Sequence, residues 1–306
     1  IFIVMDAANM TADLAELRDC QLESWPMARA NYELLGMTER RLFKIGALKG
    51  ALQFNPARRV STGAIIDADV ISRRPCFLCG SNRPPEQTAE VIVSGWDFLV
   101  NPYPIFPLHF TIASDRHIPQ MDIPIEMASM AERLPGMTVF FNGAHAGASA
   151  PDHLHCQAVM TSELPLMSYL EGGGEISRLP FKVHYDIITP DVSGMIRLHM
   201  LTHIGGKDGR TGNDDPLLVN AYMWLGADSR LRVAVVPRAA HRPSCYTAVD
   251  ETSGFMVSPG AIDMAGIIIL PRRNDFEAMT DTNIRDIYSE VALPAIDDSS
   301  DIKHND

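Results

Sequence analysis

Histidine, histidine and glutamine occupy every second position from residue 153 to residue 157, and this spacing could support chemistry at a phosphate group. In a β-strand, alternate side chains point to one face, so His153, His155 and Gln157 would lie together at steps of roughly 6.5–7 Å. The alternating residues from Leu154 to Met160 are apolar, which is typical of a face that packs in the core. An ordinary edge strand with scattered polar residues is the alternative, but the flanking residues favour a site.

A loop of small residues, from 143 to 150, leads into this strand. It follows a predicted strand over residues 138–141 and the polar residue Asn142. Glycines such as Gly147 let backbone N–H groups approach an anion closely, and Ser149 adds a hydroxyl donor. The sequence therefore predicts a phosphate-binding loop that precedes a nucleophile, with Asn142, Gly147 and Ser149 as its candidate residues.

Cys76 and Cys79 have the Cys-x-x-Cys spacing of a metal-binding knuckle. Two thiolates need two more ligands, and His117 and His153 are candidates. A metal-free reduced pair is one alternative. A redox pair is another, but such a motif opens a helix in a thioredoxin-like unit, and the prolines at 84–85 oppose a helix here.

The composition excludes several classes of protein. A net charge of −12 argues against a general nucleic-acid binder, which would carry a basic face. Five cysteines in 306 residues do not form a disulfide framework, so we expect a reducing, cytoplasmic compartment. No apolar run is long enough for a membrane span, and residues 1–5 are too short for a secretory signal.

Hydrophobic periodicity and the placement of Pro and Gly predict the elements that position these residues. In the first part of the chain we expect a helix over 11–35, strands over 97–101 and 109–113, a helix over 123–134, and strands over 138–141 and 153–160. Later we expect strands over 222–225, 231–236 and 267–270, flexible breaks at 171–175 and 205–215, and a frayed acidic tail over 297–306.

The combination of Asn142, the small-residue loop and His-x-His-x-Gln resembles the histidine-triad superfamily. The most similar branch contains galactose-1-phosphate uridylyltransferase, the diadenosine-tetraphosphate phosphorylases and the GDP-hexose phosphorylases, which carry Gln where the small hydrolases carry a third His. Asp152 separates Pro151 from His153, whereas the uridylyltransferases run Pro directly into His, so this segment is closer to the phosphorylases. The resemblance implies an α+β fold with a histidine-triad-like antiparallel sheet and flanking helices.

The order strand, strand, helix, strand, strand is that of one histidine-triad half, and we expect two fused halves. Residues 233–243 loosely echo the strand, Pro and His pattern without a His-x-His, so the second half would be degenerate. We therefore expect an N-terminal helical segment over 1–50, a catalytic half over 51–170, and a second half with an acidic tail over 171–306.

The resemblance also implies ligands. The uridylyltransferases often bind zinc, which maps here to Cys76, Cys79, His117 and His153 as a structural site, with His109 as the rival of His117. Other segments resemble parts of these enzymes that surround the nucleotide. Residues 101–120 resemble the wall of the nucleotide pocket, which makes Asn101 a candidate for binding the nucleotide. Residues 54–59 and 73–75 resemble N-terminal segments of the uridylyltransferases and make Arg74 a candidate for binding phosphate. Residues 258–276 resemble a segment beside the active site of the GDP-hexose phosphorylases. A solvated surface is the alternative for the arginines.

The resemblance gives His155 the role of nucleophile on the α-phosphorus of a nucleotide, with His153 beside it and Gln157 donating to a phosphate oxygen. Because Gln cannot protonate a leaving group, the site suits transfer to phosphate or a sugar phosphate better than hydrolysis. We expect a nucleotidyltransferase or nucleotide phosphorylase that acts on a nucleotide sugar or dinucleoside polyphosphate through a covalent nucleotidyl-histidine. The alternatives are a silent nucleotide-binding or sensing protein with a structural zinc, and a purely structural zinc protein. A homodimer is compatible with the chain.

Overall fold

A computed structural model describes residues 10–63, 68–189, 194, 196–199, 218–247, 249 and 254–295. The predicted break at 205–215, the opening segment 1–5 and the tail at 297–306 lie outside the described residues. Among the helices that are described, none is long and apolar enough to cross a membrane.

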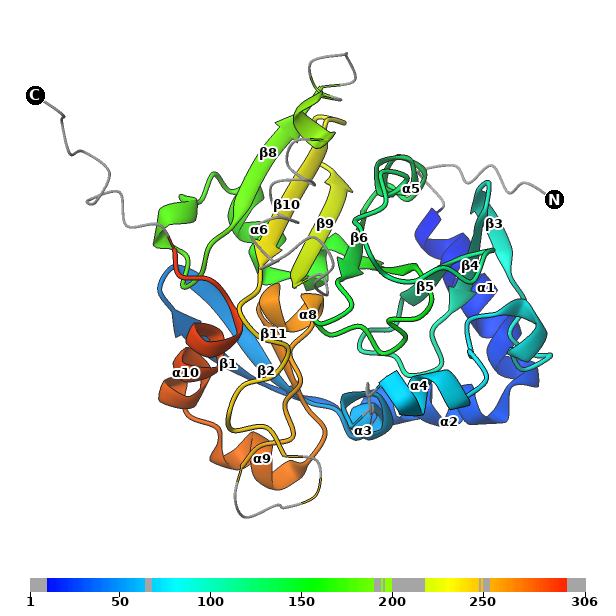
Figure 1. Cartoon of the computed structure of the whole chain (residues 1–306), viewed down its shortest axis with the longest axis horizontal. Coiled ribbons are helices and arrows are strands. Elements are labelled where there is room, and N and C mark those ends of the chain that lie inside the picture. The colour runs from blue at the N-terminus through cyan, green and yellow to red at the C-terminus, as the bar shows by residue number, and fades with distance from the viewer. Residues whose placement is uncertain are drawn as a thin grey trace, which may run out of the picture.

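The main sheet is antiparallel at every pairing and carries the predicted site near its middle. Its strands follow the spatial order β3 (Glu90–Val93), β4 (Trp96–Val100), β5 (His109–Ser114), β7 (His155–Met160), β6 (Met137–Asn142), β9 (Val219–Leu225), β10 (Leu231–Pro237) and β8 (His184–Ile188). The β6–β9 pair joins the strands of the first half of the chain to those of the second (Figure 1). The two halves therefore share one sheet.

Alternating apolar residues give the main sheet two buried faces, and the predicted site faces only one of them. Val139 and Cys156 point toward helices α1 (Met10–Ser24) and α5 (Met127–Arg133), which cover the first face. Phe140 points to the opposite face and lies directly across from Gln157 on the neighbouring strand. Since residues opposite one another in a ladder share a face, Gln157 and, two residues earlier, His155 lie on this second face.

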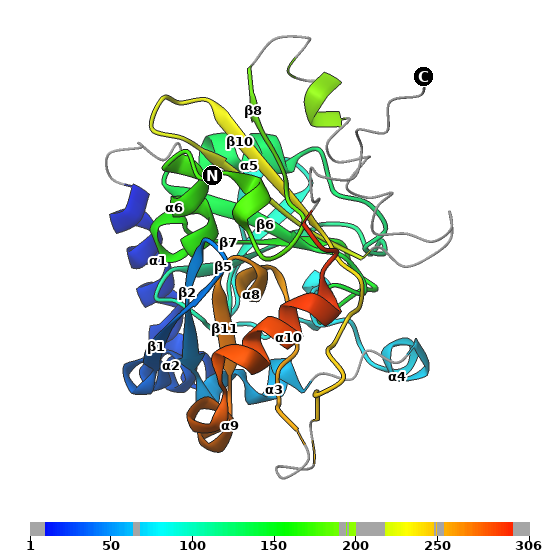
Figure 2. The same cartoon turned by 90° about the vertical axis from the view of Figure 1, so that its left-hand side faces the viewer.

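A smaller sheet packs on the second face. It consists of β1 (Glu39–Ile45), β2 (Leu48–Phe54) and β11 (Ile267–Leu270), with β1 and β2 antiparallel and β2 and β11 parallel. Figures 1 and 2 show the blue strands β1 and β2 beside the orange β11, although more than two hundred residues separate them in the sequence. The division expected at residue 50 falls inside β2, and this strand pairs with β11 from the C-terminal part of the chain.

Helices flank both sheets, which confirms the α+β class (Figure 2). Other helices whose bounds are described are α2 (Pro26–Glu33), α3 (Arg59–Thr62), α4 (Ala68–Arg73), α6 (Pro165–Glu171), α8 (Ala261–Met264), α9 (Arg273–Ala278) and α10 (Asp281–Val291). Single 3₁₀ turns are η1 (Leu34–Met37), η2 (Pro56–Arg58), η3 (Gly80–Asn82), η4 (Thr161–Glu163) and η5 (Ile176–Arg178).

Two of the differences between the predicted elements and the structure have local reasons. The helix expected over 11–35 is divided at Trp25, because Pro26 has no N–H and begins a new helix at its first position. The strand expected from His153 begins at His155. The backbone N–H of His153 donates to the Ala150 carbonyl within a turn, so pairing with β5 starts only when the chain leaves that turn.

Candidate functional site

His155 is the first residue of β7, and its ring is held in one tautomer. Its Nδ1–H donates to the main-chain carbonyl of His153 at 2.8 Å, which leaves the lone pair on Nε2. The ring is buried, and this desolvation lowers the pKa of His155 to about 4. At neutral pH, His155 is therefore an uncharged imidazole whose Nε2 has no hydrogen-bond partner within the described residues.

Gln120, which sequence reasoning missed, fixes the backbone of His155. The His155 N–H donates to Gln120 Oε1 at 2.8 Å, and Gln120 Nε2 donates to the carbonyls of Asn142 at 2.7 Å and His155 at 3.1 Å. The Gln120 side chain has no solvent exposure. It ties the end of β6 to the start of β7. A lone Gln in a loop carries no motif, so nothing in the sequence could have identified it.

Gln157 takes part in a polar network with β5. Its Oε1 lies 2.8 Å from His109 Nε2, and His109 Nδ1 accepts the backbone N–H of Ile105 at 3.1 Å. Asn101 Nδ2 donates to Thr111 Oγ1 at 3.1 Å and lies 3.5 Å from Gln157 Oε1. Asn101, predicted to bind the nucleotide, thus lies beside Gln157 in a buried layer of polar groups.

The 143–150 loop is held by residues from the second half of the chain. Asn142 Oδ1 accepts the Ala261 N–H at 2.7 Å and the Asn220 amide at 3.0 Å, and Asn220 also donates to the Ala146 carbonyl at 2.8 Å. Gly147 has a φ of +99°, and a Cβ there would lie 2.4 Å from Gly260 Cα. Only glycine fits such a backbone approach.

Ser149 is partly buried near the end of this loop, four residues before His153. The three candidate residues Asn142, Gly147 and Ser149 are therefore part of one loop between β6 and β7. Asn142 and Gly147 anchor it, and the loop leads directly to the two histidines.

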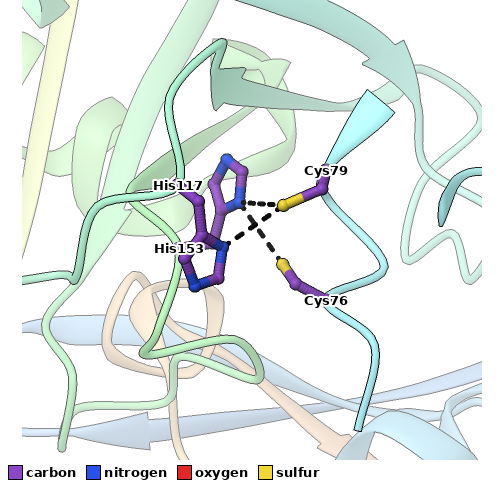
Figure 3. A group of neighbouring side chains, drawn as sticks. All are labelled: Cys76, Cys79, His117 and His153. Atoms are coloured by element: carbon purple, nitrogen blue, oxygen red, sulfur yellow. Dashed lines mark hydrogen bonds between the residues drawn. The ribbon is translucent and has the colours of Figure 1, made fainter. Parts of the chain in front are cut away.

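The predicted Cys/His cluster forms in space (Figure 3). Nδ1 of His153 lies 3.3 Å from Cys76 Sγ and 3.5 Å from Cys79 Sγ, and Nδ1 of His117 lies 3.2 Å from Cys79 Sγ. All four ligand atoms lie within 4.8 Å of one another. His153 Nε2–H donates to the Ser114 carbonyl at 2.8 Å, so its Nδ1 lone pair faces the sulfurs.

These four residues fit a metal ion. A tetrahedral zinc with Zn–S of about 2.3 Å and Zn–N of about 2.0 Å keeps sulfur and nitrogen ligands roughly 3.5 Å apart, close to the separations found here. Burial acts to raise the pKa of the Cys76 thiol, but His153 and backbone N–H groups lower it to about 6. The cluster contains His117, whereas the rival His109 bonds to Gln157 instead.

Arg74 lies beside this cluster. Its guanidinium pairs with Asp152 at 2.7 Å and stacks over the Phe77 ring, 5.0 Å from its centre. Arg74, Asp152 and the cluster residues Cys76, Cys79 and His117 line one cavity of about 350 Å³. Asp152, the residue that separates Pro151 from His153 in the sequence, thus anchors the segment that leads into the cysteines.

Comparisons with known proteins give matches to two family models and to several solved structures. Residues 17–160 match DUF4922, a domain of unknown function, and residues 220–297 match the GDPGP1-like C-terminal domain. No curated protein matches the sequence at a significant level. Among the solved structures with a similar fold are three of the yeast Ap4A phosphorylase Apa2.

One crystal structure of Apa2 has a TM-score of 0.59 at 13% identity, and the match covers 88% of this chain and 97% of the Apa2 chain. The complex with AMP has a TM-score of 0.57 at 15% identity, and the match covers 90% of this chain and 97% of the Apa2 chain. The complex with Ap4A has a TM-score of 0.56 at 13% identity, and the match covers 88% of this chain and 97% of the Apa2 chain. At such low identity these likenesses concern the fold, and they extend over both halves of the chain.

Proposed function

We propose that this chain belongs to the uridylyltransferase, Ap4A phosphorylase and GDP-hexose phosphorylase branch of the histidine-triad superfamily and is a nucleotidyltransferase or nucleotide phosphorylase. One observation carries this proposal. His155 is neutral, its Nδ1–H is engaged by a main-chain carbonyl, and its Nε2 lone pair remains for a substrate. This is the state that a nucleophilic imidazole requires.

The reaction follows from that tautomer. Nε2 of His155 attacks the α-phosphorus, the N–P bond forms, and the bridging P–O bond breaks with its electron pair leaving on the departing phosphate. The imidazole becomes a cation, and its Nδ1–H still donates to the His153 carbonyl, which stabilises the charge. An acceptor phosphate oxygen then attacks phosphorus, the P–N bond breaks and neutral His155 returns. No proton needs to be moved in either step.

The surrounding residues suit phosphate groups as leaving group and acceptor. Gln157 shares the sheet face of His155 and would donate to a non-bridging oxygen, while Ser149 and the amides near Gly147 would stabilise charge on the transferred group. Asn101, Asn142 and Arg74 complete the residues that we assign to nucleotide and phosphate binding. The substrate would be a nucleotide sugar or a dinucleoside polyphosphate, and the acceptor phosphate or a sugar phosphate. The solved relatives were crystallised with AMP and with Ap4A, which supports a nucleotide ligand.

We further propose that Cys76, Cys79, His117 and His153 hold a zinc ion. Four protein ligands leave no open position, so the ion would supply structural order and no reaction step. It would join the Cys76–Cys79 segment to His153, two residues before His155. His153 would therefore act through its position, between the metal and the nucleophile.

The test is incubation with a panel of nucleotide sugars and dinucleoside polyphosphates that carry ³²P at the α-position. Label on the protein that is stable in base and lost in acid would identify a phosphoramidate and the nucleotide that forms it. Binding without label in any member of the panel would instead support a silent nucleotide-binding protein. Zinc in the protein with neither binding nor label would support a purely structural zinc protein.

A further inference from the structure

His109 sets the orientation of the Gln157 amide. The backbone N–H of Ile105 donates to Nδ1 of His109 at 3.1 Å, so Nδ1 must carry the lone pair. A neutral imidazole has one N–H, which must then be on Nε2. Nε2 lies 2.8 Å from Gln157 Oε1, and donation across this distance requires the amide oxygen, not the amide nitrogen, to face His109.

Asn101 contacts the same oxygen of the Gln157 amide as His109 does. Its Nδ2 lies 3.5 Å from Gln157 Oε1, so two donors point toward this oxygen. The NH₂ group of Gln157 is consequently turned away from β5, and it has no hydrogen-bond partner within the described residues. Because Gln157 is partly exposed, this NH₂ group is open to a ligand on the face that also carries His155.

The surroundings keep His109 neutral. The ring is fully buried, and an imidazolium would have to donate from Nδ1 directly into the N–H of Ile105, which is itself a donor. Burial and the nearby charge of Arg58 lower the pKa of His109 to about 3, in agreement with this geometry. The orientation of Gln157 is therefore constant over the physiological pH range.

We propose that His109 is a positioning residue that holds Gln157 as a pure hydrogen-bond donor to the transferred phosphoryl group, and that it thereby favours phosphate over water as the acceptor. The inference rests on the proposed function. A phosphate dianion can attack without giving up a proton, whereas water must lose one, and a donor NH₂ cannot accept it. An amide free to rotate would present its oxygen part of the time and could orient an attacking water.

The experiment compares wild type with His109→Leu, Gln157→Leu and the double variant, using Ap4A and inorganic phosphate. The quantity measured is AMP released to water relative to ADP formed by transfer, together with kcat and KM. We expect His109→Leu to lower kcat for transfer about 10- to 100-fold with little change in KM, and to raise the hydrolysed fraction. In the Gln157→Leu background the same change should add nothing, because His109 acts through Gln157.

Gln21→Leu is the matched control, since it also removes a side-chain hydrogen bond, from Gln21 to the Thr88 carbonyl at 3.0 Å, but in helix α1, which covers the face of the main sheet opposite to Gln157. It should leave the product ratio unchanged. An unchanged ratio in His109→Leu, or equal effects of His109→Leu with and without Gln157, would overturn the inference.

Nitrogen-15 NMR of the wild-type resting protein tests the same inference without turnover. His109 should show a protonated Nε2 and an unprotonated Nδ1. The opposite tautomer, or an imidazolium at pH 7, would overturn the inference even if His109→Leu does not fold. If wild-type protein shows the expected tautomer but forms no product or label with any nucleotide, it is the proposed function that fails.

Discussion

The main-chain carbonyl of His153 accepts the Nδ1–H of His155 at 2.8 Å, while the side chain of His153 faces Cys76 and Cys79. One residue thus connects the proposed metal site to the proposed nucleophile. Its side chain belongs to the Cys/His cluster, and its carbonyl sets the tautomer of His155, two residues further on. Any displacement of His153 should therefore reach His155 directly.

We predict one zinc ion per chain and a loss of zinc in Cys76→Ser. The four ligands join segments that are distant in sequence, so the loss of zinc should lower the thermal unfolding midpoint more than it changes the chemistry. Elemental analysis of protein purified without chelator or added metal is the measurement. Cys20→Ser, at an exposed cysteine, is the control and should keep its zinc. Wild-type protein without zinc, or full zinc content in His117→Ala, would disprove the ligand assignment.

Gln120→Leu should destabilise the protein and slow the reaction. It leaves the buried N–H of His155 and carbonyl of Asn142 without this partner, at a cost of about 2–4 kcal/mol in the free energy of unfolding. Gln21→Leu is a matched change at another buried glutamine, whose amide nitrogen donates to the Thr88 carbonyl. Urea unfolding of both variants, with kcat for each, gives the comparison. If only Gln21→Leu reduced kcat, Gln120 would have no role in placing His155.

Alanine substitutions at two glycines with a left-handed backbone should distinguish the cost of backbone strain from the cost of a steric contact. Gly173 has φ +74° with open space around it, and Gly147 has φ +99° with Gly260 in close contact. Gly173→Ala should cost about 1–2 kcal/mol, from the backbone conformation alone. Gly147→Ala should cost roughly 1–3 kcal/mol more because the loop must move. Urea unfolding measures both, and equal costs would show that the loop does not press against Gly260.

Gln157→His should change the fate of the nucleotidyl group. A third imidazole can move a proton, which an amide cannot, so we expect slower transfer to phosphate and a larger fraction lost to water. We make this prediction because Gln157 lies two residues after His155 on the same sheet face. Nucleoside monophosphate released per turnover, with and without acceptor, is the measurement. An unchanged ratio of hydrolysis to transfer would mean that residue 157 does not touch the phosphoryl group.

Local patterns in the sequence were sufficient for much of the fold. The alternation through residues 153–160 predicted a strand with His155 and Gln157 on one face, and the structure contains this strand from His155 to Met160. Pro and Gly marked the ends of neighbouring elements. The Cys-x-x-Cys spacing, with the family resemblance, predicted the four residues that meet in the Cys/His cluster. These features depend on short-range geometry that one strand or one turn determines.

Long-range contacts could not be predicted in the same way. The sequences of β2 and β11 carry no pattern that reveals their parallel pairing. The sequence therefore offered no reason to keep β2 in one piece, and the expected division at residue 50 lies within it. Gln120 is one of several glutamines, and only the fold brings it to His155. His109 was a rival metal ligand in the sequence, because spacing alone does not reveal that its ring meets Gln157 across the sheet.

The central claim is that His155 carries the nucleotide during the reaction, and a direct measurement is the mass of the trapped intermediate. Protein mixed with substrate, without acceptor, should be quenched in base and mapped by mass spectrometry. We predict one nucleoside monophosphate group on the peptide containing His155 and none in folded His155→Ala, whose transfer rate should fall at least about 10³-fold, or roughly 4 kcal/mol. Near wild-type transfer by His155→Ala, or an adduct on any other residue, would contradict the account.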